Sequence, residues 1–245
     1  MMIKLKKNMS TIILLFLGII ASLTIKSDSP DILVSKKFKP EFKDQLNNFV
    51  YLVSEVSLFD RSLPESSASG FIFASNESHV FIITAHHFCQ DNEISPEIAI
   101  AKRTIYAINS KFPREAHVIA YDTKNDICIL TGIKYSWEKF KDVKFADSMP
   151  KIGEDVYNFA APNGISSPNI NLMFKGFFSG CDNDNCLYTI PATFGSSGSA
   201  VYNKKGELIS IVVSASPEFE NVAIGPDIYK IKKLVDDTDK IVRIK

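Results

Sequence analysis

The chain of 245 residues carries 28 basic and 28 acidic side chains, so its formal net charge is zero. A chain of this length forms one domain or two, and a hydrophobic share of 45% is ample for a packed core. The balanced charge gives no strongly basic surface, so we expect no nucleic-acid partner.

The N-terminus has the layout of an export signal. Three lysines within the first seven residues precede an apolar run over residues 11–25. Extended back to residue 9, the run is about as long as the shortest helix that crosses a bilayer. No clear small-residue cleavage site follows it. Residues 1–27 are therefore predicted to be either a signal peptide or a signal anchor whose residues 9–25 insert into the membrane. The rest of the chain is expected outside the cytoplasm, as a secreted, periplasmic or membrane-anchored protein.

The period of the apolar residues changes near residue 49. Phe42, Leu46 and Phe49 recur at helical spacing, so residues 28–48 are predicted to be a linker with a short helix. From there the pattern is of short strands separated by turns, which is typical of an all-β barrel or sandwich. The expected strands cover residues 50–58, 68–74, 80–85, 98–101, 104–108, 116–121, 127–131, 155–161, 172–178, 187–190, 200–202, 208–213 and 222–226.

These strands form two halves within one predicted domain, residues 49–237. The halves cover about residues 50–135 and 150–226, and a charged connection joins them. The polar stretch between residues 58 and 68 is expected to be a loop. Apolar residues recur at helical spacing from Ile228 to Val235 and predict a C-terminal helix. A tail over residues 238–245 leaves no room for a peptide-binding appendage.

Three short stretches carry residues suited to nucleophilic catalysis. Gly195-Ser196-Ser197-Gly198-Ser199 can turn tightly and present a serine hydroxyl, although a plain Gly/Ser loop between strands would have the same composition. His86 and His87 end an apolar strand, and Asp126 stands at the head of another. A nucleophilic serine needs such a base and such an acid, and they occur here in the order His, Asp, Ser.

These residues resemble the motifs of the chymotrypsin-like serine peptidases. Those enzymes carry Thr-Ala-x-His, Asp-[Ile/Leu]-Ala-Leu and Gly-[Asp/Asn]-Ser-Gly-[Gly/Ser] in this order. The matching stretches here are Thr84–His87, Asp126–Leu130 and Gly195–Ser199. The resemblance is closest to the bacterial and viral branch, with the high-temperature-requirement and glutamyl endopeptidase groups, and without a PDZ domain. It implies two six-stranded antiparallel β-barrels followed by the C-terminal helix.

The resemblance also implies a function and roles for the matching residues. The chain would be a serine endopeptidase that hydrolyses protein or peptide substrates through an acyl-enzyme intermediate, with no cofactor and no metal. Ser197 would be the nucleophile, His87 the base and Asp126 the acid that orients the base. The backbone N–H groups of Gly195 and Ser197 would form the oxyanion hole.

Three positions depart from the family pattern. Ser196 replaces the usual Asp or Asn before the nucleophile, and Ala200 replaces the usual Pro. His86 stands where the family has a small residue or Asn, so either histidine could be the base. The Thr-x-x-His spacing from Thr84 selects His87.

Residues beside the nucleophile in this family shape the pocket for the substrate side chain. The corresponding residues here are Thr193, Val213 and Ser214, with no acid among their neighbours to bind Arg or Lys. We therefore expect a preference for a small or apolar substrate side chain before the cut.

The four cysteines fit an exported protein. Cys181 and Cys186 bracket a polar turn and are a disulfide candidate. Cys89 and Cys128 each lie two residues after a predicted triad residue, and a bond between them and two buried free thiols both remain open. No spacing of His and Cys matches a zinc-site pattern.

Two other functions remain to be compared with the peptidase. The same fold could be a catalytically inactive binding or scaffold protein, although such proteins usually lose a triad residue. An esterase of the α/β-hydrolase class would place its nucleophile between a strand and a helix. Here strand-like residues follow Ser197, which disfavours the esterase.

Overall fold

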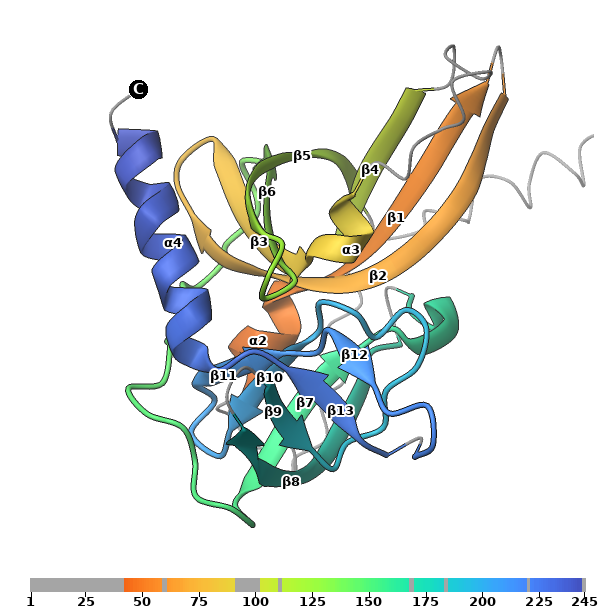
Figure 1. The fold of residues 1–245 in the computed structure, drawn as a ribbon. Coiled ribbons are helices and arrows are strands. Elements are labelled where there is room, and N and C mark those ends of the chain that lie inside the picture. Colours follow the sequence, from red (N-terminus) through yellow and green to blue (C-terminus); the bar gives the residue numbers. More distant parts are fainter. Residues whose placement is uncertain are drawn as a thin grey trace, which may run out of the picture. The chain divides into compact units, whose positions relative to one another are not determined.

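The computed structural model describes residues 42–58, 61–90, 102–109, 112–167, 170–182, 185–219 and 221–243, all within one compact unit (Figure 1). The predicted signal or anchor, most of the predicted linker and the strand expected at 98–101 lie outside these residues. No helix within the described ranges is long and apolar enough to cross a membrane. The helices are α2 (Lys43–Asn48), α3 (His86–Cys89), the 3-10 helix η3 (Pro162–Gly164) and α4 (Ile228–Arg243).

The strands are mostly those that the alternating pattern predicts. They are β1 (Phe49–Leu58), β2 (Arg61–Ser75), β3 (His79–Ala85), β4 (Lys102–Asn109), β5 (Phe112–Asp122), β6 (Ile127–Ile133), β7 (Asp155–Ala160), β8 (Leu172–Asp182), β9 (Asn185–Tyr188), β10 (Ala200–Asn203), β11 (Leu208–Ile211), β12 (Ser214–Ala215) and β13 (Ala223–Gly225).

The first six strands close into an antiparallel barrel in the order β1-β2-β3-β6-β5-β4. Side chains alternate between two hydrophobic clusters because successive residues of a strand point to opposite faces. Ile72 and Ile82 belong to a cluster with Leu52 and Leu130, whereas Phe71 belongs to a second cluster. The second cluster also contains residues of the other half, among them Phe159 and Tyr202. Burial on both faces explains why β3 reads as a continuous apolar run.

The second half differs from the predicted closed six-stranded barrel. It is a seven-stranded sheet in the order β11-β10-β7-β8-β9-β13-β12, and it is not closed. Its edge strands, β11 and β12, are consecutive in the chain, and the strand expected at residues 208–213 overlaps only the first of them. The backbone changes partners between them: the N–H of Val212 donates to the C=O of Ser199 (2.9 Å), but that of Val213 donates to Ile224 (2.9 Å). Because of this change of partner, β11 ends at Ile211, before the end of the expected strand.

The prediction of a loop between residues 58 and 68 was also wrong. Residues 61–67 belong to β2 and pair with β1 as far as Leu58, so the two strands form the long ribbon seen in Figure 1. Side chains at residues 62–66 are exposed, so this part of the ribbon carries no apolar face. Without one, the alternation that predicts strands is missing.

The predicted C-terminal helix is confirmed as α4, and it continues to Arg243, into the residues expected to be a tail. Its residues Ile228 and Ile231 are fully buried in the cluster that joins the two halves. The helix contacts β5 of the barrel and β11 of the second sheet, so it packs against both.

Candidate active site

His87 lies at the point where β3 passes into the single turn of α3. The backbone N–H of the preceding residue, His86, donates to the C=O of Asp126 at 3.1 Å, which joins this turn to the start of β6. The His87 side chain is about half exposed and is therefore accessible to a substrate.

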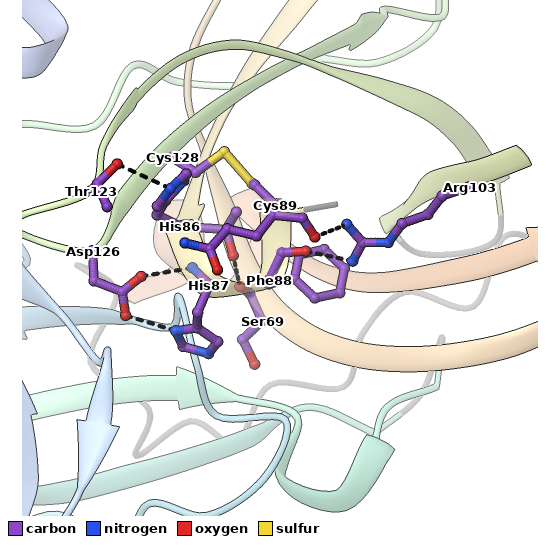
Figure 2. The surroundings of a disulfide bond; sticks show 11 residues. Ser69, His86, His87, Phe88, Cys89, Arg103, Thr123, Asp126 and Cys128 are labelled. Carbon is purple, nitrogen blue, oxygen red and sulfur yellow. Dashed lines mark hydrogen bonds and ion pairs between the residues drawn. A yellow bond between two sulfur atoms is a disulfide. The ribbon is translucent and has the colours of Figure 1, made fainter. Parts of the chain in front are cut away.

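Asp126 makes two hydrogen bonds to the same residue (Figure 2). The backbone N–H of His87 donates to Oδ1 at 2.7 Å, and Nδ1 of the imidazole lies 2.6 Å from Oδ2. Asp126 has a φ of 54°, in the left-handed region that few residues other than glycine adopt. The carboxylate thus holds both the backbone and the ring of His87.

Ser197 completes a continuous chain of hydrogen-bonding groups across the two halves. Its Oγ lies 2.9 Å from Nε2 of His87, on the opposite side of the ring from Asp126. The next residue, Gly198, has a φ of 81°, and a Cβ there would lie 2.2 Å from Oγ1 of Thr84. Only glycine therefore allows the loop to approach β3 this closely.

The loop at Ser197 leaves two N–H groups that donate to no acceptor among the described residues. The N–H of Ser196 donates to the C=O of Thr193 at 2.9 Å, and Gly195, with a φ of 85°, occupies the turn between them. The Phe194 C=O accepts from the N–H of Asn163 at 2.6 Å. Within the described ranges, the N–H groups of Gly195 and Ser197 donate to no other residue, so both can serve an incoming oxyanion.

The predicted pocket residues lie at two places around this loop. Thr193 is exposed at its start, Val213 is half-buried after β11, and Ser214 is exposed on β12, where it pairs with Ile224. Phe194, which directly precedes Gly195, is 88% exposed.

The four cysteines form two disulfides, Cys89–Cys128 and Cys181–Cys186. The first joins α3 to β6, the two elements beside His87 and Asp126 (Figure 2). The second closes the hairpin of β8 and β9. No cluster of His, Cys, Asp or Glu in the described parts of the chain is arranged to hold a metal ion.

Arg103 is a further residue that the sequence did not identify. Its guanidinium donates to the C=O of Phe88 (2.6 Å) and of Gln90 (2.5 Å) at the end of α3, and its Nε donates to Glu65 (2.9 Å). These bonds come from β4 and fix the turn that carries His87. A lone arginine in a strand has no sequence signal for such a contact.

His86, the other candidate base, is placed differently from His87. Its ring is stacked on Tyr121 with centroids 4.7 Å apart, and its Nε2 lies 3.3 Å from Oγ1 of Thr123. Only 8% of the residue is exposed. These contacts hold its ring within the first barrel, whereas the ring of His87 reaches Ser197.

Comparison with known proteins gives the family. Residues 68–211 match the model of the trypsin-like peptidase domain. Serine protease HtrA-like of Staphylococcus aureus is 23% identical over 232 residues, which cover 84% of this chain. The chain spans only about 29% of the length of these curated relatives. The family match confirms the resemblance inferred from the three motifs.

Solved structures show the same fold. The serine endoprotease from Yersinia pestis is 19% identical with a TM-score of 0.62, over 81% of this chain and 65% of that one. An inactive mutant of Rv3671c from M. tuberculosis H37Rv is 15% identical with a TM-score of 0.58, over 82% and 91% of the two chains. At these identities the likeness concerns the fold alone.

Proposed function

The chain belongs to the trypsin-like peptidase family of serine-type peptidases, and we propose that it is an endopeptidase that uses Ser197, His87 and Asp126 as its catalytic triad. The observation that carries the proposal is the uninterrupted series of contacts from the Asp126 carboxylate through the His87 ring to the Ser197 hydroxyl, at 2.6 and 2.9 Å. Both distances lie within the range that proton transfer requires.

The proposed reaction proceeds in two halves. The Ser197 Oγ attacks the scissile carbonyl as its proton passes to Nε2 of His87, and His87 then gives that proton to the leaving amine. Asp126 keeps the Nδ1 proton in place and stabilises the charged imidazolium. Water, deprotonated by His87, then attacks the acyl-enzyme, and the released Ser197 takes the proton back.

The N–H groups of Gly195 and Ser197 would stabilise the oxyanion that forms in each half. Preorganised donors are effective because they need no rearrangement as the charge develops. What supports this role is that neither group donates to another described residue.

A substrate would bind as an additional strand. β12 is an edge strand of the second sheet and follows β11 closely, near the loop of Ser197. An extended peptide can pair with such an edge through its main chain. Its side chain before the cut would then lie among Thr193, Val213 and Ser214, so we propose small or apolar residues there. Cleavage of a peptide library tests this preference directly.

Fluorophosphonate labelling tests the proposed nucleophile. The reagent forms a covalent bond with an activated serine, and intact mass reports it. We expect labelling of the wild-type protein and none of Ser197→Ala. Labelling of both proteins would show that Ser197 is not the serine that reacts. A folded wild type that is not labelled would instead favour a catalytically inactive binding or scaffold protein.

The location outside the cytoplasm is also a proposal. Two disulfides within the described residues support it, because disulfides persist in oxidising compartments. Residues 1–27 would direct export and residues 49–237 would form the peptidase domain. Fractionation of the source cells, with intact mass of the recovered protein, distinguishes a removed signal from a retained anchor. Recovery in the cytoplasm with reduced cysteines would contradict the proposal.

A further inference from the structure

Ser69 of β2 connects the first barrel to the loop that carries Ser197. It is completely buried, with 0% of the residue exposed. Its hydroxyl donates to the C=O of Gly195 at 2.7 Å and accepts from the N–H of Ala161 at 2.9 Å. Its backbone N–H donates to the C=O of Ser197 at 2.8 Å. One residue of the first half therefore holds two carbonyls of the loop in the second half.

The position of Ser69 is itself held from a third strand. Its C=O accepts from Oγ1 of Thr84 at 2.8 Å, three residues before His87. Its hydroxyl uses its single donor and an acceptor position, so it is committed to Gly195 and Ala161. These bonds fix Ser69 relative to both parts of the proposed active site.

The hydroxyl of Ser69 also acts on the loop by a second route. Ala161, whose N–H it accepts, leads into η3, and the N–H of Asn163 in that turn donates to the C=O of Phe194. The carbonyls of Phe194 and Gly195 are thus held away from the reaction space. The C=O of Thr193 and of Ser196 accept from the N–H groups of Ser196 and Ser199. All five carbonyls from residue 193 to residue 197 consequently have a partner.

Fixing these carbonyls determines where the free N–H groups point. A peptide unit is planar, so a carbonyl held on one side directs its N–H to the other. The Phe194 carbonyl orients the N–H of Gly195, and the Ser196 carbonyl orients that of Ser197. The bonds of Ser69 to the neighbouring carbonyls prevent the loop from rotating as a whole.

The side chain of Ser196 does not provide this support. The family usually has an acid or amide here, but among the described residues the Ser196 hydroxyl has one hydrogen bond, accepted from the N–H of Thr193 at 3.2 Å within the same turn. Among the residues described, the contacts that connect the loop to the first barrel include both bonds donated by Ser69.

We propose that Ser69 is a positioning residue that aligns the oxyanion hole of Gly195 and Ser197. The inference rests on the proposed peptidase function. Ser69 is fully buried, and its hydrogen bonds to other described residues do not include His87, so it acts through the loop. Removing its hydroxyl should therefore weaken stabilisation of the transition state and leave substrate binding unchanged.

Ser69→Ala tests the proposal by separating kcat from KM. We expect kcat for a peptide substrate to fall on the order of 100-fold, as for a lost oxyanion donor, with KM within about twofold. The pH profile of kcat/KM should keep its midpoint, because the contacts between His87 and Asp126 are untouched. Ser69→Ala leaves the Ala161 N–H and the Gly195 C=O unpaired, so a lower melting temperature is expected in either case, whereas a variant that only loosened the fold would change KM as well.

Paired inhibitors give a second measure of the same effect. A peptide aldehyde forms a tetrahedral adduct with Ser197 whose oxygen occupies the oxyanion hole, whereas the matching peptide alcohol binds without an adduct. Ser69→Ala should weaken binding of the aldehyde by about the same factor as kcat/KM, because the aldehyde adduct mimics the transition state. Binding of the alcohol should not change. Equal weakening of both would overturn the proposal.

Two further variants complete the experiment. Ser69→Thr keeps the hydroxyl and should keep most of the wild-type kcat; if it folds and loses kcat as Ser69→Ala does, the hydroxyl is not the cause. It also carries the test if Ser69→Ala does not fold. Ser210→Ala removes an equally buried hydroxyl, which donates to the C=O of Pro226 at 2.6 Å, and should retain wild-type kcat.

The two proposals fail in different ways. If the wild type has no activity, or Ser197→Ala keeps it, the proposed function is wrong. If the wild type is active, Ser197→Ala is inactive and Ser69→Ala keeps wild-type kcat, only the role of Ser69 is wrong.

Discussion

The Asp126 carboxylate binds His87 through both of its oxygens, one to the backbone N–H at 2.7 Å and the other to the ring Nδ1 at 2.6 Å. Asp126→Asn should lower kcat by about 10,000-fold near neutral pH, because an amide accepts through only one atom and the imidazole tautomer is no longer fixed. Steady-state kinetics on a peptide substrate measures the loss. Asp122→Asn, which changes an acid of the same turn, should stay near wild type. A loss under tenfold for Asp126→Asn would remove this residue from the triad.

The two adjacent histidines should respond oppositely to substitution. His87→Ala should reduce kcat at least about 10,000-fold, since it removes the base that Ser197 contacts. His86→Phe keeps a ring for the stack on Tyr121 and loses only the bond to Thr123, so it should cost about 1 kcal/mol of stability and leave kcat near wild type. The reverse result would identify His86 as the base.

The sequence was most informative where chemistry imposes a local pattern. The short motifs around His87, Asp126 and Ser197 identified three residues that the structure brings within hydrogen-bonding distance. Strands of the barrel were predicted because each is a short run of apolar residues, continuous where both faces are buried, as in β3. The pairing of Cys89 with Cys128 stayed open because the residues are 39 apart in the chain, and spacing alone does not determine a distance.

The features that the sequence did not predict depend on contacts between distant segments. Ser69 and Arg103 are a serine and an arginine in ordinary strands, and only the closed barrel places them beside the active-site loop and α3. The break between β11 and β12 depends on a change of pairing partner at Val213, which leaves the apolar pattern of the segment unchanged. Local patterns carry no information about such long-range partners.

Two glycines with nearly the same φ provide a matched test of crowding. Gly195 and Gly153 have φ values of 85° and 87°. A Cβ at Gly195 would lie 2.5 Å from the carbonyl oxygen of Ala161, whereas a Cβ at Gly153 would have no atom of a described residue within 4 Å beyond its chain neighbours. Gly153→Ala should cost about 1 kcal/mol from backbone strain and keep full activity. Gly195→Ala should also displace the loop and reduce kcat on the order of 100-fold or more. Equal kcat values for the two variants would show that the loop tolerates the displacement.

The two disulfides should contribute unequally to stability. In the chain-entropy model the bond between Cys89 and Cys128, 39 residues apart, is worth about 4 kcal/mol, and that between Cys181 and Cys186, five apart, about 2 kcal/mol. Double alanine variants of each pair, unfolded in urea, measure both. The first variant should also lose activity at temperatures where the second keeps it, because only the first bond joins α3 to β6. A larger loss of stability from the hairpin pair would contradict the model.

Glu207 should make the stability of the second sheet depend on pH. This largely buried carboxylate accepts hydrogen bonds from Lys144 and, at 2.9 Å, from Nδ2 of Asn203, and these bonds hold its pKa below the usual value for glutamate. Because the folded pKa is lower than the unfolded one, the stabilisation is present above the unfolded pKa and is lost as the pH falls through the folded pKa.

Glu207→Gln should therefore be less stable than the wild type at pH 7, and the difference should be smaller at pH 3. Urea unfolding midpoints of both proteins at the two pH values measure the change. Glu218→Gln, at an exposed position, is the matched control and should show little difference at either pH. A difference between wild type and Glu207→Gln that stays constant from pH 7 to pH 3 would mean that side-chain packing, rather than the charge of Glu207, provides the stability.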